Sequence, residues 1–168
     1  MALTADELKA LLKLKPLAME GGYFAETYRS AETITHPSLP LRYRQDKSFG
    51  TAIYFLLTPD TFSVLHRLPT DEVYHFYLGD PVELLQLHPD GSGTVTILGH
   101  DLSSGMKLQF TVARGTWQGS RLCAGGGFAL MGTTMAPGFD HEDFEGGVRQ
   151  QLLHAYPQFR ELILALTR

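Results

Sequence analysis

The sequence predicts an all-β, single-domain protein in which short helices stand only at the two ends of the domain. The chain has 168 residues and a mass of 18.6 kDa, which fits one domain around one hydrophobic core. Its 17 glycines and 9 prolines are spread along the chain and separate many short apolar runs. Such a pattern is typical of an antiparallel sandwich or barrel, and we expect one domain over residues 1–168.

The first predicted element is a helix at about residues 4–14. Thr4 and Glu7 form the T-x-x-E pattern of a capping box, in which the two residues cap each other's backbone amides. Leucines then recur at helical spacing until Pro16, which a helix interior does not accommodate. The segment lacks an uninterrupted apolar core, so we do not expect a secretory signal.

The barrel is predicted over about residues 21–135. Short runs rich in aromatic and β-branched residues alternate here with turn signals such as HPDGSG. The runs are GGYFAETYR, TAIYFLLT, FSVLHRL, EVYHFYL, VELLQLH, TVTILG, KLQFTV, TWQGSRL and GFALMGTTM. We expect about ten short strands and no long helix between them.

The last predicted element is a helical segment at about residues 142–167. Apolar residues recur there at intervals of three and four, before and after Pro157. The proline is expected to open a second helix or to break the first.

Composition excludes several classes of function. The net charge is −4, and no cluster of Lys and Arg offers a surface for nucleic acid. No apolar stretch is long enough to span a membrane. Cys123 is the only cysteine, so we expect neither an intramolecular disulfide nor a thiolate metal cluster, and we expect a cytoplasmic protein.

The hairpin HRLPTDEVYHFYLGD, residues 66–80, carries the strongest candidate site. Strand alternation places His66 on one face with the apolar Phe62, Val64 and Leu68, and places Ser63, Leu65 and Arg67 on the other face. Beyond the turn, the alternate set is Glu72, Tyr74, Phe76 and Leu78. An imidazole and a carboxylate are therefore expected to meet inside the barrel.

This hairpin resembles the first motif of the cupin superfamily, in which a glycine precedes His-x-His, a glutamate and a second glycine. The chain has Asp60, His66, Leu68, Glu72 and Gly79 at that spacing, so one histidine is replaced by leucine. The second cupin motif, Pro-x-Gly-x-x-His, is similar to ARGTWQ. There Gly115 is retained, but Gln118 stands in the place of the third histidine.

A closer likeness is to a small group of bacterial and fungal cupin-domain proteins with no established activity. The matching segments are EGGYFAETYRS at 20–30, TAIYFLL at 51–57, HRLPTDEVYH at 66–75, GTWQ at 115–118 and APGFDHEDFE at 136–145. The resemblance implies a jelly-roll barrel, a homodimer and similarity to sugar-nucleotide epimerase cupins. It implies no particular reaction.

The candidate metal ligands are His66, Glu72 and Gln118. Gln118 offers only a neutral amide oxygen and Leu68 offers no ligand atom, whereas catalytic sites normally have three strong protein ligands. His75 would need a bulge to reach the same face as Glu72. We therefore expect no required cofactor, with a weakly held divalent metal as the alternative.

The buried His66 and Glu72 also suit acid–base chemistry, because burial and pairing move the pKa values of both groups towards neutrality. In this hypothesis His66 is the base, Glu72 orients it, Tyr74 is a proton donor and Gln118 hydrogen-bonds a carbohydrate-like or polar substrate. A pair that only fills space is the structural alternative. A metabolite-binding module without turnover and a metal-dependent cupin enzyme are the two rival functions.

The strand at 21–30 supplies weaker candidates for ligand binding. Alternation places Tyr23 and Arg29 on one face and Glu26 and Tyr28 on the other, and it does not show which face lines the pocket. We keep Tyr23, Glu26 and Arg29 as candidates, together with His75. A homodimer is also expected, because open sheets often cover an edge strand by pairing.

Overall fold

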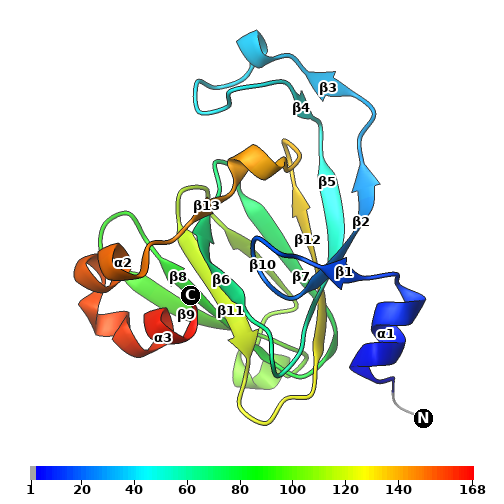
Figure 1. Ribbon diagram of the computed structural model, residues 1–168, viewed down its shortest axis with the longest axis vertical. Helices are drawn as coiled ribbons and strands as arrows, with labels where there is room; N and C mark the ends of the chain where they lie inside the picture. Colours follow the sequence, from blue (N-terminus) through cyan, green and yellow to red (C-terminus); the bar gives the residue numbers. More distant parts are fainter. Residues whose placement is uncertain (1–2) are drawn as a thin grey trace.

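The computed structural model describes residues 3–168, and its main strands form two antiparallel sheets that face each other (Figure 1). The first sheet contains, in order, β1 (Lys15–Pro16), β2 (Tyr23–Arg29), β5 (Thr51–Leu57), β12 (Ala129–Met135), β7 (Glu72–Gly79) and β10 (Gln109–Val112). The second contains β13 (Glu145–Gly146), β6 (Ser63–Arg67), β11 (Trp117–Leu122), β8 (Val82–Leu87) and β9 (Gly93–Leu98). Each of the nine predicted apolar runs contains one of these strands, so the all-β prediction is confirmed.

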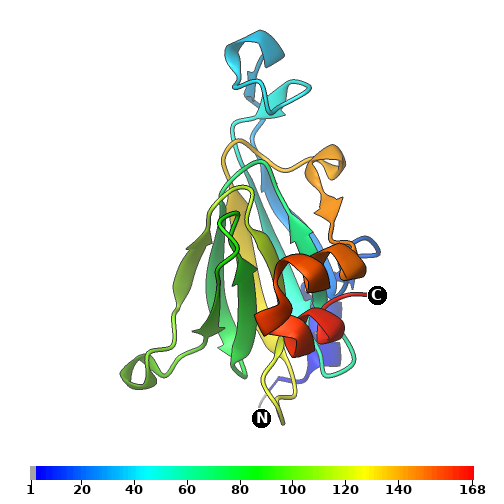
Figure 2. The same ribbon diagram turned by 90° about the vertical axis from the view of Figure 1, so that its left-hand side faces the viewer.

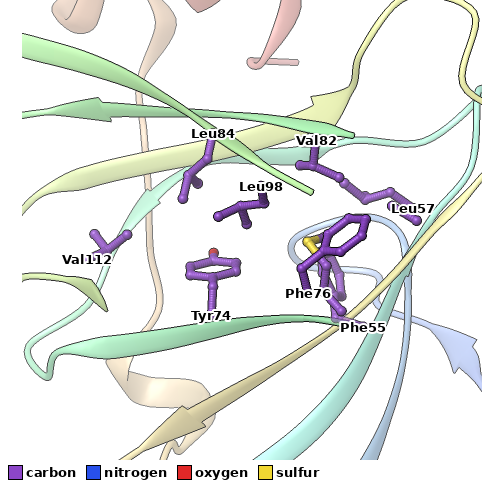
Figure 3. Packing of buried hydrophobic residues seen from close by; sticks show 10 residues of the cluster. Phe55, Leu57, Tyr74, Phe76, Val82, Leu84, Leu98 and Val112 are labelled. Atoms are coloured by element: carbon purple, nitrogen blue, oxygen red, sulfur yellow. The ribbon is translucent and has the colours of Figure 1, made fainter. Parts of the chain in front are cut away.

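The main core lies between the two sheets. Figure 3 shows Phe55, Tyr74 and Phe76 of the first sheet facing Leu84 and Leu98 of the second. All of these side chains are buried. Full burial of a large apolar side chain contributes about 1.5–3 kcal/mol, so this layer holds the sheets together.

The C-terminal helices cover the outer face of the second sheet (Figure 2). α2 (Arg149–Ala155) and α3 (Arg160–Ala165) are separated by the 3₁₀ helix η4 (Pro157–Phe159), which Pro157 opens. Leu152 and Ile163 pack from these helices against Leu65 of β6. The helical segment begins at Arg149, later than the predicted 142, because β13 first pairs with β6.

The N-terminal helix α1 (Ala5–Leu11) is capped by Thr4 and Glu7 in the predicted capping box. It buries Leu8 against Leu56 and Leu130 on the outer face of the first sheet. The helix ends at Leu11 rather than near residue 14, and the chain turns at Lys13, which has a positive φ of 54°. No helix within residues 3–168 is both long and apolar enough to cross a membrane.

Residues 30–50 form an arm that extends beyond one end of the barrel (Figures 1 and 2). It contains β3 (Thr33–Ile34), β4 (Lys47–Ser48) and the 3₁₀ helix η1 (His36–Ser38). The arm returns to the barrel through two buried side chains, Tyr43 and Lys47. Its return segment therefore has a fixed position at the barrel mouth.

Three strands contain bulges that change which side chains face inwards. The register shifts occur in β2 between Glu26 and Tyr28, between β6 and β11, and in the pairing of β7 with β12. An extra residue reverses the alternation beyond it. The bulge in β7 lies at Tyr77, and Leu78, predicted to face inwards, is 42% exposed.

Candidate functional site

A cavity of about 80 Å³ lies between the sheets at the end of the barrel near the arm. Its polar lining includes Glu20, His66, Glu72 and Thr133. Its apolar lining consists mainly of Leu17, Phe24, Ile53, Leu68, Met135, Phe139 and Phe144. Glu26, Arg29, Thr51 and His141 also line the cavity. The buried groups His66, Glu20 and Glu72 thus lie in a largely hydrocarbon wall.

His66 is fixed in one orientation and one tautomer. Its Nδ1 lies 2.7 Å from the carbonyl oxygen of Val64, and a carbonyl only accepts, so Nδ1 carries the proton. The ring stacks on Phe144 with centroids 4.9 Å apart. Burial lowers the pKa of His66, against the opposing charge of Glu72. The ring is therefore neutral at pH 7, and Nε2 is left as a basic acceptor.

Glu72 is buried beside Gln118. The Gln118 Nε2 donates to Glu72 Oε2 at 2.8 Å, while the Gln118 Oε1 has no hydrogen-bond partner within residues 3–168. Burial raises the pKa of Glu72, and the nearby charge of Glu20 raises it further, whereas His66, Thr133 and Gln118 oppose the shift. Glu72 is therefore a weaker acid than an exposed glutamic acid.

Glu20 is a second buried carboxyl group in the cavity, to which sequence analysis assigned no role. Gly21 and Gly22, with φ of 113° and 66°, form a tight turn, and the Val64 amide donates to the Glu20 carbonyl at 2.9 Å. The Ser63 hydroxyl donates to Glu20 Oε1 at 2.6 Å. Burial raises the pKa of Glu20 to about 7, although the Ser63 hydrogen bond lowers it. The only sequence signal was its place at the start of EGGYFAETYRS.

Ser63 reaches Glu20 because a bulge in β6 turns its side chain inwards. The predicted faces of β6 were therefore wrong. Gln118 pairs with His66 and Ser120 pairs with Ser63, so β6 has one extra residue between its two pairs. Ser63 therefore shares the inner face with His66. Phe62, predicted to lie inside, packs instead with the cluster under the C-terminal helices.

The raised pKa of Glu20 predicts a decline in stability with rising pH. Between pH 4.5 and about 7 the folded protein keeps a proton on Glu20 that the unfolded chain has lost. The contribution of Glu20 to the free energy of unfolding is therefore largest below pH 4.5 and is lost as the pH rises through about 7. Glu20→Gln is expected to flatten the decline and to raise the melting temperature at pH 8. Thermal unfolding at several pH values measures this. The exposed Glu32→Gln serves as control, and an unchanged slope in Glu20→Gln would contradict the assignment.

Tyr74 does not line the cavity. It lies in the main core among Leu84, Leu98 and Val112, and it is 1% exposed (Figure 3). Burial, followed by the nearby charge of Glu72, raises the pKa of Tyr74 well above 10. The predicted proton donor is therefore a core residue behind Glu72, since β7 turns its side chain into the packed layer.

The bulge in β2 places Glu26 and Arg29 on the same face, whereas alternation predicted opposite faces. Glu26 and Arg29 both line the cavity and form a bidentate ion pair at 3.0 and 2.8 Å. Tyr23 lies on the other face, where Lys9 approaches its ring.

His75 of β7 also lies outside the barrel, because the bulge in β7 comes after it. Its side chain is hydrogen-bonded to Thr134 at 3.0 Å. Tyr23 and His75 thus do not meet His66 and Glu72.

The segment 136–146 closes the cavity and is held by ion pairs. Lys47 Nζ donates to Asp140 Oδ2 at 3.0 Å and to Asp143 Oδ2 at 2.5 Å. Arg29 donates to the Phe139 carbonyl at 2.8 Å and also to Asp140. Asp140 and Asp143 of the acidic run DHEDFE also form the capping box of the 3₁₀ helix η3 (His141–Asp143).

The residues present do not fit the metal of a typical cupin site. Leu68 provides a hydrocarbon wall, and the Gln118 amide is already used as a donor to Glu72. Within residues 3–168, no three His, Cys, Asp or Glu side chains are grouped as ligands. His66 and His141 both line the cavity, but they do not form with its carboxyl groups the ligand cluster of such a site.

Comparison with known proteins is consistent with this barrel. A family model described as Cupin superfamily (DUF985) matches residues 6–146. A protein of Shewanella oneidensis, solved by X-ray crystallography, is 34% identical with a TM-score of 0.87, covering 99% of each chain. A hypothetical protein from Leishmania major is 32% identical with a TM-score of 0.86, covering 98% of this chain and 99% of that chain.

Two further proteins are similar to this chain at lower sequence identity. An uncharacterized protein of Saccharomyces cerevisiae is 29% identical over 133 residues, covering 74% of this chain. This chain spans only 66% of that relative's length. Oxalate decarboxylase from Bacillus subtilis has a TM-score of 0.53 at 14% identity, covering 88% of this chain and 35% of that chain, which shows a shared fold alone.

Proposed function

The chain belongs to the DUF985 family of the cupin superfamily, and from this premise we propose that it binds a small polar metabolite in its barrel and transfers a proton on it. The reaction class we propose is isomerase or epimerase-like. The fold by itself carries no reaction, so the proposal rests on the side chains of the cavity.

One observation carries the proposal: a neutral His66 with a free Nε2 shares a small cavity with two weakened carboxyl acids. The Val64 carbonyl fixes the proton on Nδ1, and Glu20 has a pKa raised to about 7. A neutral imidazole beside a carboxyl group that keeps its proton towards neutral pH supplies the base and the acid that proton transfer requires. A purely structural pair would not need a second buried carboxyl group beside it.

The proposed steps use only these groups. His66 Nε2 takes a proton from an acidic C–H of the substrate, and the protonated Glu20 returns one to the resulting carbanion or enolate. The imidazolium then gives its proton to the Glu20 carboxylate, which restores both groups. Glu72, oriented by Gln118, stabilises the imidazolium. Glu26 and Arg29 contribute polar groups to the lining of the cavity.

The test is exchange of substrate C–H protons with deuterated water, followed by NMR over a panel of sugars, sugar phosphates and sugar nucleotides. His66→Gln is expected to slow exchange about 100-fold or more, because it removes the base. His154→Gln, at an exposed position of α2, is the matched control. Circular dichroism verifies that both variants fold. Absence of exchange by the wild-type protein across the panel contradicts the catalytic proposal.

Binding without turnover is the second candidate, and the closed segment 136–146 favours it. A cavity sealed by Lys47 and Arg29 suits retention of a ligand more than rapid release. A metabolite that raises the melting temperature and is recovered unchanged supports this alternative.

We further propose that no metal is required, which the donor set at Leu68 and Gln118 supports. Metal analysis of the purified protein tests it. A full equivalent of a transition metal, with loss of stability on chelation, would overturn this proposal.

We also propose a cytoplasmic homodimer. Exposed Tyr28, Tyr77 and Leu78 of the first sheet offer apolar surface for a second copy, and Cys123 has no second cysteine for an intramolecular disulfide. Light scattering is expected to give twice the chain mass of 18.6 kDa, and a monomer would contradict the proposal.

A further inference from the structure

A second, larger hollow of about 600 Å³ opens at the barrel mouth, beside the cavity. Four arginines line it: Arg42, Arg44, Arg67 and Arg114. They come from the arm, from β6 and from the turn before β11, segments that lie far apart in the sequence. We call this hollow the arginine cleft.

The arginines stand on fixed backbone. Arg42 and Arg44 flank Tyr43, which is 2% exposed and whose hydroxyl lies 2.7 Å from that of Thr70. The amide of Arg114 donates to Asp71 Oδ1 at 2.8 Å. The next residue, Gly115, donates to the Leu68 carbonyl at 2.9 Å. The cleft is therefore built before any ligand arrives.

Three of the four arginines in the cleft form no ion pair within residues 3–168. Arg67 is paired with Glu145 at 2.7 and 2.8 Å, and Asp143 is paired with Lys47. Within residues 3–168, no carboxylate forms an ion pair with Arg42, Arg44 or Arg114. The remaining acid of the lining is Glu142. Four arginines against three carboxylates, Glu142, Asp143 and Glu145, give the lining a net charge of +1. Arg42 Nε donates to the Pro69 carbonyl at 2.9 Å.

The cleft and the cavity share a wall, since Leu68 and Phe144 line both. Sites for small organic ligands usually have volumes of about 300–1,000 Å³. The cavity of about 80 Å³ is too small to hold such a ligand alone, whereas the cleft of about 600 Å³ is in range. We infer that a ligand of that size reaches His66 only if it extends from the cleft past Leu68 and Phe144.

We propose that the arginine cleft binds the phosphate group of a small phosphorylated metabolite, whose uncharged end is directed towards Leu68 and the cavity. A phosphate carries a charge near −2 at pH 7, and Arg42, Arg44 and Arg114 have no carboxylate partner within residues 3–168 that would compete with it. The planar guanidinium fork donates two parallel hydrogen bonds to phosphate oxygens. The role of the cavity end rests on the proposed function, but the anion site does not depend on it.

The test is titration calorimetry of the wild-type protein with inorganic pyrophosphate and orthophosphate at low ionic strength. Arg44→Gln and Arg114→Gln are each expected to weaken pyrophosphate binding about fivefold. Glu142→Gln is expected to tighten it, because a like charge is removed. Arg160→Gln, an exposed arginine at the start of α3, is the matched control and is expected to change nothing.

The outcomes separate the two proposals. His66→Gln is expected to keep full pyrophosphate affinity, so a loss of C–H exchange in that variant does not affect the anion site. No saturable pyrophosphate binding, equal weakening by Arg160→Gln, or equal affinity for malonate would each overturn the phosphate site. If the wild-type protein binds pyrophosphate but shows no C–H exchange, only the catalytic proposal is overturned.

Discussion

Lys47→Met is expected to lower the free energy of unfolding by about 3–5 kcal/mol, because it breaks a buried ion-pair network from one side. The Lys47 side chain is 1% exposed and that of Asp143 is 7% exposed. Without the ammonium group, the Asp143 carboxyl group loses its ion-pair partner in a site with little access to water. Methionine has a similar length, so the loss of charge dominates over the loss of volume.

Urea denaturation measures this effect, with the same substitution at Lys107 as control. Lys107 is exposed and forms no ion pair within residues 3–168, so Lys107→Met is expected to change stability by less than about 0.5 kcal/mol. Amide hydrogen exchange of the segment 139–146 is also expected to speed up in Lys47→Met, because the network holds that segment over the cavity. A loss below about 1 kcal/mol would show that the network contributes little.

Gly79→Ala is expected to destabilise the protein by about 3 kcal/mol or more. Gly79 has a φ of 97°, and an added Cβ would lie 2.2 Å from the backbone oxygen of Phe128. The Asp80 amide donates to that oxygen at 2.8 Å, so the two segments cannot separate without loss of the bond. The final glycine of the cupin motif is thus required by a close backbone approach.

Gly91→Ala separates the steric contact at Gly79 from the conformational penalty of a positive φ. Gly91 has a φ of 87°, but a Cβ there would meet no atom within 4 Å. Its substitution is expected to cost only about 1 kcal/mol, the conformational penalty of the left-handed region. Denaturant unfolding of both variants checks the difference, and equal losses would mean that the contact with Phe128 yields easily.

Strand existence and type were predictable from this sequence because the apolar runs are long and the turns are well marked. Alternation along β7 placed Glu72, Tyr74 and Phe76 inside the barrel, where they are buried. The capping box at Thr4 also needed only local information. In each case the signal depends on residues close together in the chain.

The faces of β2 and β6 were not predictable by alternation, because one extra residue in each strand reverses the pattern. This is why Glu26 and Arg29 point the same way, and why Ser63 joins His66. Bulges are stabilised by pairing with other strands, so a single strand's sequence does not reveal them.

Glu20 and the arginine cleft were missed for a different reason. Glu20 meets Ser63 across 43 residues of sequence, and Arg44 meets Arg114 in one cleft only through the folded arm. No period or motif connects such positions. The interior of a pocket is assembled by tertiary contacts, which no local sequence pattern encodes.

Leu68 stands at the boundary between these two assemblies, with carboxyl groups on its inner side and guanidinium groups on its outer side. Its hydrocarbon side chain, 5% exposed, separates the polar groups of the cavity from the arginines of the cleft. The arginines without an ion-pair partner within residues 3–168 lie on the cleft side of this residue. In the proposed binding mode, a ligand with one anionic end keeps that end among the arginines and presents its uncharged end to Leu68, so the arrangement of the two hollows sets the orientation in which it binds.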